Sequence, residues 1–142
     1  MKKIGIIMGS DSDLPVVEKA INVCREYGVP FEVHVYSAHR TPVEAKEFSQ
    51  KARANGFGAI LAAAGMAAHL AGAIAANTTL PVIGIPVATV AIDGAANAAL
   101  LAIQILAVTD EALAEKLDRA REEGAAKVLS KNQAIEKAYN TL

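Results

Sequence analysis

The chain has 142 residues, of which 53% are hydrophobic but only 4% aromatic, with no Trp, so its core must be built from Ala, Val, Ile and Leu. This length predicts a single domain, residues 1–142, that buries a core without disulfides or metals, and the single Cys excludes a disulfide framework and a cysteine-based metal site. The formal net charge is −1 and there is no basic stripe, which argues against a nucleic-acid partner. No run reaches about 18 apolar residues, which argues against a membrane partner. Because no signal-peptide pattern is present, a cytoplasmic protein is predicted.

Strands and helices are expected to alternate along the chain. Continuous apolar runs are typical of buried parallel strands, the alternation of apolar and polar residues at 31–36 is also typical of a strand, and apolar residues at a period of 3.6 indicate helices. The expected strands, in chain order, are residues 4–8, 31–36, 57–64 and 81–92, and the expected helices are about residues 14–28, 41–56, 67–76 and 94–107, followed by a helical tail from about residue 109. This order predicts a parallel sheet with helices on both faces, a three-layer α/β/α sandwich.

Particular residues predict how these helices end and what covers them. Gly28 is a typical helix stop, and Thr-Pro-Val-Glu at 41–44 has the pattern of a capping box with proline at the first helical position. Gly124 is expected to interrupt the C-terminal helix, leaving a tail that folds back or packs on a neighbour. Cys24 falls in an apolar stripe and is interpreted as a small buried hydrophobe rather than a reactive thiol. The Ala-rich helix at 94–107 has too little polar surface to face water on most sides, so we expect a homo-oligomer.

Three loops are predicted to share one edge of the sheet. In parallel α/β sheets, ligands bind beyond the carboxyl ends of the strands. The loops at that end are residues 9–13 after the first strand, 37–40 after the second and 64–70 after the third. Their side chains are therefore the candidates for a functional site, which we call the rim.

The first rim loop is suited to phosphate. Gly9 allows close backbone approach, Ser10 and Ser12 carry hydroxyls, and the N-terminus of the following helix favours anions. The loop is not a P-loop and lacks the dinucleotide fingerprint. The alternative is that Ser12 and Asp13 only cap the helix, since Ser and Asp are preferred caps.

The other two loops bring a cation and two imidazoles to the rim. Arg40 can bind a phosphate with two hydrogen bonds, although a surface ion pair is the alternative. His39 has the side chain best suited to proton transfer near neutral pH, and His69 is a second imidazole, whereas His34 lies inside a strand and is interpreted as a partly exposed sheet residue without a role. Metal binding by His39 and His69 is a competing idea, but Asp13 is the only candidate third ligand. Because no nucleophile elbow is present, the residues indicate proton-transfer chemistry on a small phosphorylated ligand.

Four segments carry a resemblance to a known family. They are residues 8–13 (MGSDSD), 37–42 (SAHRTP), 65–70 (GMAAHL) and 95–102 (AANAALLA). In this order and spacing they resemble the N5-carboxyaminoimidazole ribonucleotide mutases of purine biosynthesis. The resemblance implies a parallel flavodoxin-like sheet, a homo-octamer, and a phosphorylated aminoimidazole ribonucleotide as the substrate. It also implies transfer of a carboxylate from N5 to C4 of that substrate with no cofactor and no metal.

The resemblance also implies roles for individual residues. His39 would be the catalytic acid and base. The loop at 65–70 would line a pocket that confines CO2. The histidine at position 69 resembles the pattern of the mutase branch of the family rather than that of the branch that uses free CO2. The residues implied to bind the substrate are Ser10, Asp13 and Arg40, around its ribose and phosphate, and Gly9, Ser37, Gly65, His69 and Leu70.

The chain departs from this family after Val87. Members place roughly twenty residues, a loop and a helix, between two strands that are fused here in residues 81–92, although a parallel crossover needs a dozen or more residues. Either the chain makes one long strand and loses a sheet position, or the sequence omits a segment. Three hypotheses stay open: an active mutase, a non-catalytic oligomeric variant that binds the nucleotide or is purely structural, and a direct carboxylase that uses free CO2.

Overall fold

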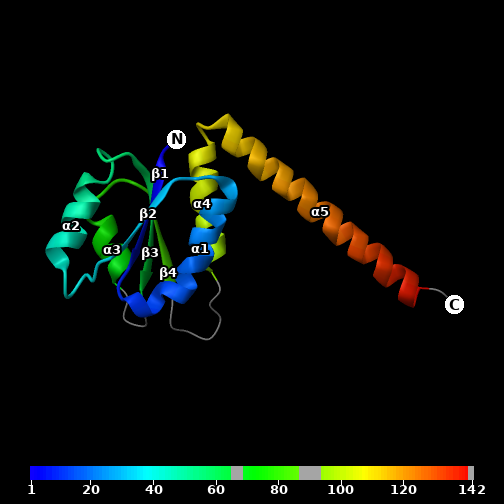
Figure 1. The fold of residues 1–142 in the computed structure, drawn as a ribbon, viewed down its shortest axis with the longest axis horizontal. Coiled ribbons are helices and arrows are strands. Elements are labelled where there is room, and N and C mark those ends of the chain that lie inside the picture. The colour runs from blue at the N-terminus through cyan, green and yellow to red at the C-terminus, as the bar shows by residue number, and fades with distance from the viewer. Residues whose placement is uncertain (65–68, 87–93, 141–142) are drawn as a thin grey trace.

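The computed structural model describes residues 1–64, 69–86 and 94–140 of the chain. Its strands are β1 (Lys3–Met8), β2 (Phe31–Val35), β3 (Phe57–Ala64) and β4 (Val82–Pro86). Its helices are the short 3-10 turn η1 (Asp11–Asp13) and the α-helices α1 (Leu14–Tyr27), α2 (Pro42–Lys51), α3 (Leu70–Ala75), α4 (Ala95–Ala107) and α5 (Glu111–Tyr139). The predicted alternation of strands and helices is confirmed (Figure 1).

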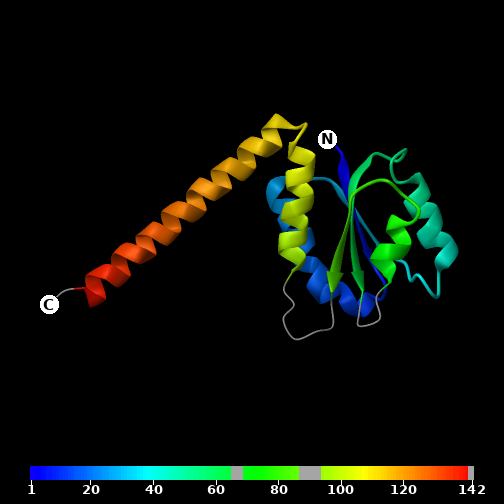
Figure 2. The ribbon, with the colours of Figure 1, turned by 180° about the vertical axis from the view of Figure 1, so that it is seen from behind.

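The four described strands form one parallel sheet in the order β2-β1-β3-β4. Helices cover both of its faces, so the flavodoxin-like three-layer architecture predicted from the sequence is confirmed (Figures 1 and 2). The register pairs Met8 of β1 with Val35 of β2 and with Ala63 of β3. The carboxyl ends of these three strands therefore stand level, which puts the loops that follow them at one edge.

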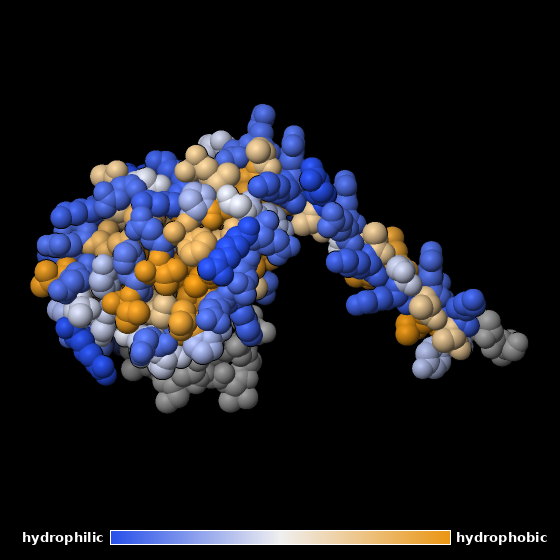
Figure 3. All heavy atoms as spheres, in the orientation of Figure 1, coloured by the Kyte–Doolittle hydropathy of each residue, from blue (hydrophilic) through white to orange (hydrophobic). Residues whose placement is uncertain are grey.

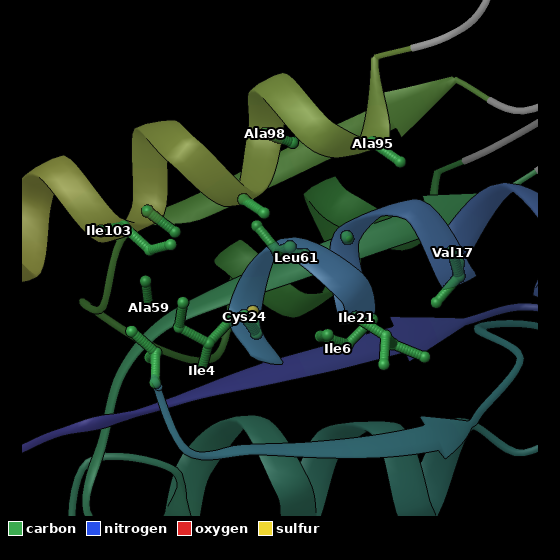
Figure 4. Close-up of a cluster of buried hydrophobic side chains, with 14 of the residues drawn as sticks. Ile4, Ile6, Val17, Ile21, Cys24, Ala59, Leu61, Ala95, Ala98 and Ile103 are labelled. Atoms are coloured by element: carbon green, nitrogen blue, oxygen red, sulfur yellow. The ribbon is translucent and has the colours of Figure 1, made fainter. Parts of the chain in front are cut away.

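One face of the sheet packs against α1 and α4. Alternate strand residues such as Ile4, Ile6 and Leu61 point toward these helices and are fully buried. Figure 4 shows them converging with side chains of α1 and α4, among them Cys24, which has no exposed surface. Burial raises the pKa of this thiol to about 11, so the interpretation of Cys24 as a buried hydrophobe is confirmed.

The intervening strand residues face α2 and α3. Ile7 and Ile60 belong to a second buried cluster with Leu70 and Ile74 of α3. Because both faces are covered, the central strands β1 and β3 consist largely of buried apolar residues, as parallel strands usually do, whereas β2 at the sheet edge alternates apolar and polar residues. The α2 helix ends at Lys51, before the predicted closure near Gly56, because turns rather than helix occupy residues 52–56.

Helix α5 differs from its prediction. Asp110 caps its start, since the Asp110 side chain accepts a hydrogen bond from the Leu113 amide at 3.0 Å, and the helix runs from Glu111 without a break through Gly124 to Tyr139. The predicted interruption at Gly124 is wrong, because a glycine in a helix costs only about 1 kcal/mol relative to alanine and does not by itself stop the helix. Residues 121–139 are exposed, and the helix extends away from the sheet and its covering helices (Figure 1).

The fourth strand is shorter than the predicted run at 81–92. It occupies Val82–Pro86, while residues 87–93 lie outside the described ranges. Within those ranges the sheet has no strand beyond β4. The helix predicted at 67–76 is present as α3 from Leu70, and residues 67–68 also lie outside. None of the helices in the described parts is long and apolar enough to cross a membrane.

Candidate functional site

The backbone brings the three rim loops together at the carboxyl end of the sheet. The Gly9 amide donates to the Ala63 carbonyl at 3.0 Å, and the Tyr36 amide donates to the Met8 carbonyl at 3.0 Å, so the hydrogen bonding of the sheet continues to the start of the loops. A Cβ placed on Gly9 would lie 4.0 Å from Cδ2 of Leu70. The first loop therefore lies directly beside the start of α3, as the parallel topology predicts.

In the first loop the capping role falls to a different residue from those expected. Ser10 caps η1, since its Oγ accepts a hydrogen bond from the Ser12 amide at 3.3 Å and lies 2.9 Å from the Ser12 hydroxyl. Asp13 precedes α1 and is only 8% exposed, yet its side chain makes no capping hydrogen bond. The alternative in which Asp13 serves only as a helix cap is therefore wrong, which leaves a ligand-binding role for its carboxylate consistent with the geometry.

The second loop is held by hydrogen bonds between its two hydroxyl residues. The Ser37 amide donates to Oγ1 of Thr41 at 2.8 Å, and that hydroxyl donates back to the Ser37 carbonyl at 3.2 Å. The Ser37 Oγ accepts hydrogen bonds from the amides of His39 at 3.3 Å and Arg40 at 3.1 Å. The loop thus presents His39 and Arg40, both exposed, from a closed backbone turn.

Thr41 does not form the predicted capping box. It stands at the N-cap of α2 without a side-chain capping bond, because its hydroxyl is turned back to Ser37. In a capping box the Glu44 side chain would accept a hydrogen bond from the Thr41 amide. Here that amide donates to the Ser37 carbonyl at 3.0 Å instead. Sequence reasoning missed this loop-closing role, and the serine four residues before Thr41 is the signal that points to it.

Of the third loop, the structure describes Ala64, which ends β3, and then His69 and Leu70. His69 is exposed and stands at the N-cap of α3 without a side-chain capping bond. Leu70 is 3% exposed and packs in the second buried cluster, so it contributes to the floor beneath the rim rather than to its surface. Gly65, implied by the resemblance to bind substrate, lies outside the described residues.

The remaining histidine belongs to the sheet, as predicted. On β2, Nε2 of His34 lies 3.3 Å from Oε2 of Glu32, and the His34 ring stacks on Tyr36 with centroids 5.1 Å apart. Glu32 also pairs with Lys3, and hydrogen bonds from Lys3 and then His34 lower the pKa of its carboxyl group. Among the described residues, no group of three His, Cys, Asp or Glu side chains could hold a metal ion.

A hollow of about 670 Å³ lies at the opposite, amino-terminal end of the sheet. It is lined by Lys2, Arg53, Thr109 and their neighbours, and none of the predicted site residues contributes to it. Because ligands of parallel sheets bind beyond the carboxyl ends of the strands, we place the candidate site at the rim and not in this hollow.

Comparisons with known proteins agree with the resemblance. The AIR carboxylase family matches residues 3–88 and 84–127. N5-carboxyaminoimidazole ribonucleotide mutase of Pyrococcus horikoshii is 46% identical over 156 positions, covering 94% of this chain and 88% of that protein. The protein of the same name from Methanocaldococcus jannaschii is 44% identical over 158 positions, covering 96% and 99%. The crystal structure of Treponema denticola PurE2 has the same fold, with a TM-score of 0.84 at 21% identity over 96% of this chain and 99% of that one.

The comparisons also locate the departure after Val87. Residues 84–88 match the family twice, once at the end of the first matched segment and once at the start of the second. Both alignments to the relatives are longer than the 142 residues of this chain. The relatives therefore carry positions that have no counterpart in this chain, and the double match of the family at residues 84–88 is consistent with the predicted break at this junction.

Proposed function

The chain belongs to the AIR carboxylase family, and we propose that it acts as an N5-carboxyaminoimidazole ribonucleotide mutase of purine biosynthesis. The observation that carries this proposal is an identity of 46% and 44% to proteins of that name across nearly the whole chain. The rim supports it, because the exposed imidazoles of His39 and His69 and the exposed guanidinium of Arg40 follow the carboxyl ends of strands, where ligands of this fold bind. We take residues 1–142 as one mutase-like domain.

In the proposed reaction the carboxylate moves by way of CO2 held in a closed pocket. The bond from N5 to the carboxylate carbon breaks, CO2 is released, and N5 takes up a proton. C4 of the aminoimidazole then attacks the CO2 and loses its own proton. Confinement matters because CO2 that escapes ends the reaction, whereas CO2 kept beside C4 has a high effective concentration.

His39 is the proposed acid and base. It gives a proton to N5 and removes one from C4, so it ends the cycle in the state in which it began, and no cofactor is required. Its exposed side chain and its backbone bond to Ser37 support this role, because the ring is reachable and the backbone that carries it is fixed. An imidazole also has the ordinary pKa best matched to proton transfer near neutral pH.

The substrate is proposed to bind across all three loops. Ser10, Asp13 and Arg40 hold the ribose and phosphate, while Gly9 and Ser37 complete the nucleotide site. The missing capping bond of Asp13 and the exposed guanidinium of Arg40 support these assignments. The residues proposed to line the CO2 pocket are Gly65, His69 and Leu70.

The test is conversion of N5-carboxyaminoimidazole ribonucleotide by the purified chain and by three variants. His39→Asn is expected to lower kcat by about 100-fold or more, since it removes the acid and base. Arg40→Ala should mainly raise KM, because it removes phosphate binding. His34→Asn, which makes the same change on β2, should match the wild type. If His39→Asn consumed substrate as fast as the wild type, the acid and base assignment would be wrong.

One observation favours a second candidate. The relatives carry residues that this chain lacks, and the family matches residues 84–88 twice. By resemblance, the loop and helix that family members place after the equivalent of Val87 help to cover the nucleotide and the CO2 pocket. A chain without this cover would bind the nucleotide without transferring the carboxylate. Calorimetric binding of the substrate by a wild type that does not convert it would support this non-catalytic variant. Incorporation of labelled bicarbonate into the product would instead support direct carboxylation by free CO2.

We also propose a homo-oligomer, an octamer by family resemblance, acting in the cytoplasm. Exposed apolar side chains on α4 and α5 support the association of subunits. Leu101 on α4 is 47% exposed, and Val128, Ile135 and Tyr139 on α5 are between 59% and 78% exposed. Figure 3 shows such apolar side chains along the part of α5 that lies away from the sheet.

A further inference from the structure

The loop that carries His39 and Arg40 is closed by one side chain at its end. The Thr41 hydroxyl uses both of its functions on Ser37, accepting from its amide at 2.8 Å and donating to its carbonyl at 3.2 Å. The Thr41 amide adds a third bond to the same carbonyl at 3.0 Å. The two ends of the loop are therefore fixed to each other through Thr41.

Ser37 passes this constraint on to the two functional residues. Its Oγ accepts the amide hydrogens of both His39 and Arg40, at 3.3 and 3.1 Å. A hydroxyl oxygen has two lone pairs, so these two bonds use its accepting capacity and leave its proton to be donated. Ser37 can hold the backbone of His39 and Arg40 in this way only while its own backbone stays in place, and the Thr41 hydroxyl fixes that backbone on both sides.

The use of the Thr41 hydroxyl in the loop has a cost at α2. A threonine at an N-cap ordinarily bonds to a free amide of the first helical turn, and Thr41 makes no such bond. Pro42 at the first helical position has no amide hydrogen to satisfy and already has a φ suited to a helix, so α2 starts without that help. The Thr41 hydroxyl thus stabilises the conformation of the loop and does not cap the helix.

We propose that Thr41 is a positioning residue for the transfer reaction, acting through Ser37 on the placement of His39 and Arg40; this rests on the proposed function. In this role it acts through Ser37 and not by contact with the substrate. Its effect is to keep the imidazole and the guanidinium in one geometry before the nucleotide binds, so that little loop ordering remains to be done on binding. Misplacing a reacting group by about an ångström can reduce the rate by about 100-fold.

Two substitutions separate this role from simple packing. Thr41→Val keeps the shape of the side chain and removes the hydroxyl, whereas Thr41→Ser keeps the hydroxyl and removes the methyl group. Positioning predicts that kcat/KM falls by about 10- to 100-fold in Thr41→Val and stays near the wild-type value in Thr41→Ser. A packing role predicts the opposite order. The matched control is Thr78→Val, which removes a hydroxyl that accepts the Leu80 amide at 3.2 Å between α3 and β4.

Thermal unfolding and amide hydrogen exchange complete the test. The melting temperature of Thr41→Val should fall no further below that of the wild type than the melting temperature of Thr78→Val does. Its loss of activity is then not explained by unfolding. In Thr41→Val the amides of Ser37, His39 and Arg40 should exchange faster than in the wild type, and in Thr41→Ser they should not. Full activity in Thr41→Val, or unchanged exchange of these amides, would overturn the proposal. A wild type without mutase activity would refute the proposed function alone, since amide exchange still tests the loop.

Discussion

At the scale of single residues, Cys24 is the most sharply defined prediction. It is fully buried between α1 and the sheet, and burial raises the pKa of its thiol to about 11. Since the thiolate is the reactive form, the folded chain should react with a thiol reagent such as DTNB only as fast as it unfolds. The measurement is the rate of colour release in buffer and in concentrated urea. Fast reaction of one equivalent in buffer would contradict the burial.

Residue roles at the rim could be predicted only in part. The residue types of His39 and Arg40 and their place after a strand are enough to nominate them, because the topology brings the ends of parallel strands to one edge. The loop-closing role of Thr41 could not be predicted from residue type, because the same Thr-Pro pattern occurs both where the threonine caps a helix and where it closes a loop. Which of the two roles Thr41 takes depends on where Ser37 lies after β2, and that position is set by the tertiary structure. Asp13 is similar, because only the structure shows that it does not cap α1.

At the scale of elements, the close approach of α4 to β3 can be tested at one glycine. A Cβ on Gly58 would lie 2.4 Å from Cδ2 of Leu106 and 2.9 Å from Cβ of Lys2. Gly58→Ala should therefore lower the free energy of unfolding by about 1 to 3 kcal/mol, the usual cost of overpacking. Gly72→Ala is the matched control, because among the described residues no atom outside its own stretch of helix lies within 4 Å of the added Cβ, and alanine favours helix by about 1 kcal/mol. Urea unfolding at one protein concentration measures both, and equal effects would contradict this packing.

The elements themselves were predictable where burial decides them. The continuous apolar runs predict β1 and β3 to within a residue at each end, because strands covered on both faces are largely apolar. The alternation of apolar and polar residues predicts β2 equally closely. Helix ends were less predictable. Gly124 has the sequence pattern of an interruption, but the exposed helix around it has no packing to disturb and continues. Such ends depend on small local free energies that the pattern of apolar residues does not contain.

At the scale of the whole molecule, the sheet and its junction follow from chain connectivity. Two parallel neighbours need a crossover, so the fused run at 81–92 predicts either a lost sheet position or an omitted segment. The described sheet has no strand beyond β4, and the family matches residues 84–88 twice. The double match fits a chain in which a crossover is missing, and it does not depend on the rim, whose three loops precede the junction.

The outward half of α5 gives the prediction that belongs to the assembled molecule. Leu113 is buried and Leu117 partly buried against the chain's own core, and Ile135 lies 18 residues, or about five helical turns, after Leu117 on the same face. In one copy that face is bare at Ile135, which is 59% exposed, so we expect a second copy to cover it.

Ile135→Glu should lower the mass measured by sedimentation while leaving the circular dichroism of the sheet and its helices unchanged. Leu129→Glu is the matched control, since Leu129 is 61% exposed but lies about a third of a turn away from that face. If Leu129→Glu alone dissociated the oligomer, or if Ile135→Glu left its mass unchanged, this face of α5 would not be the contact between subunits.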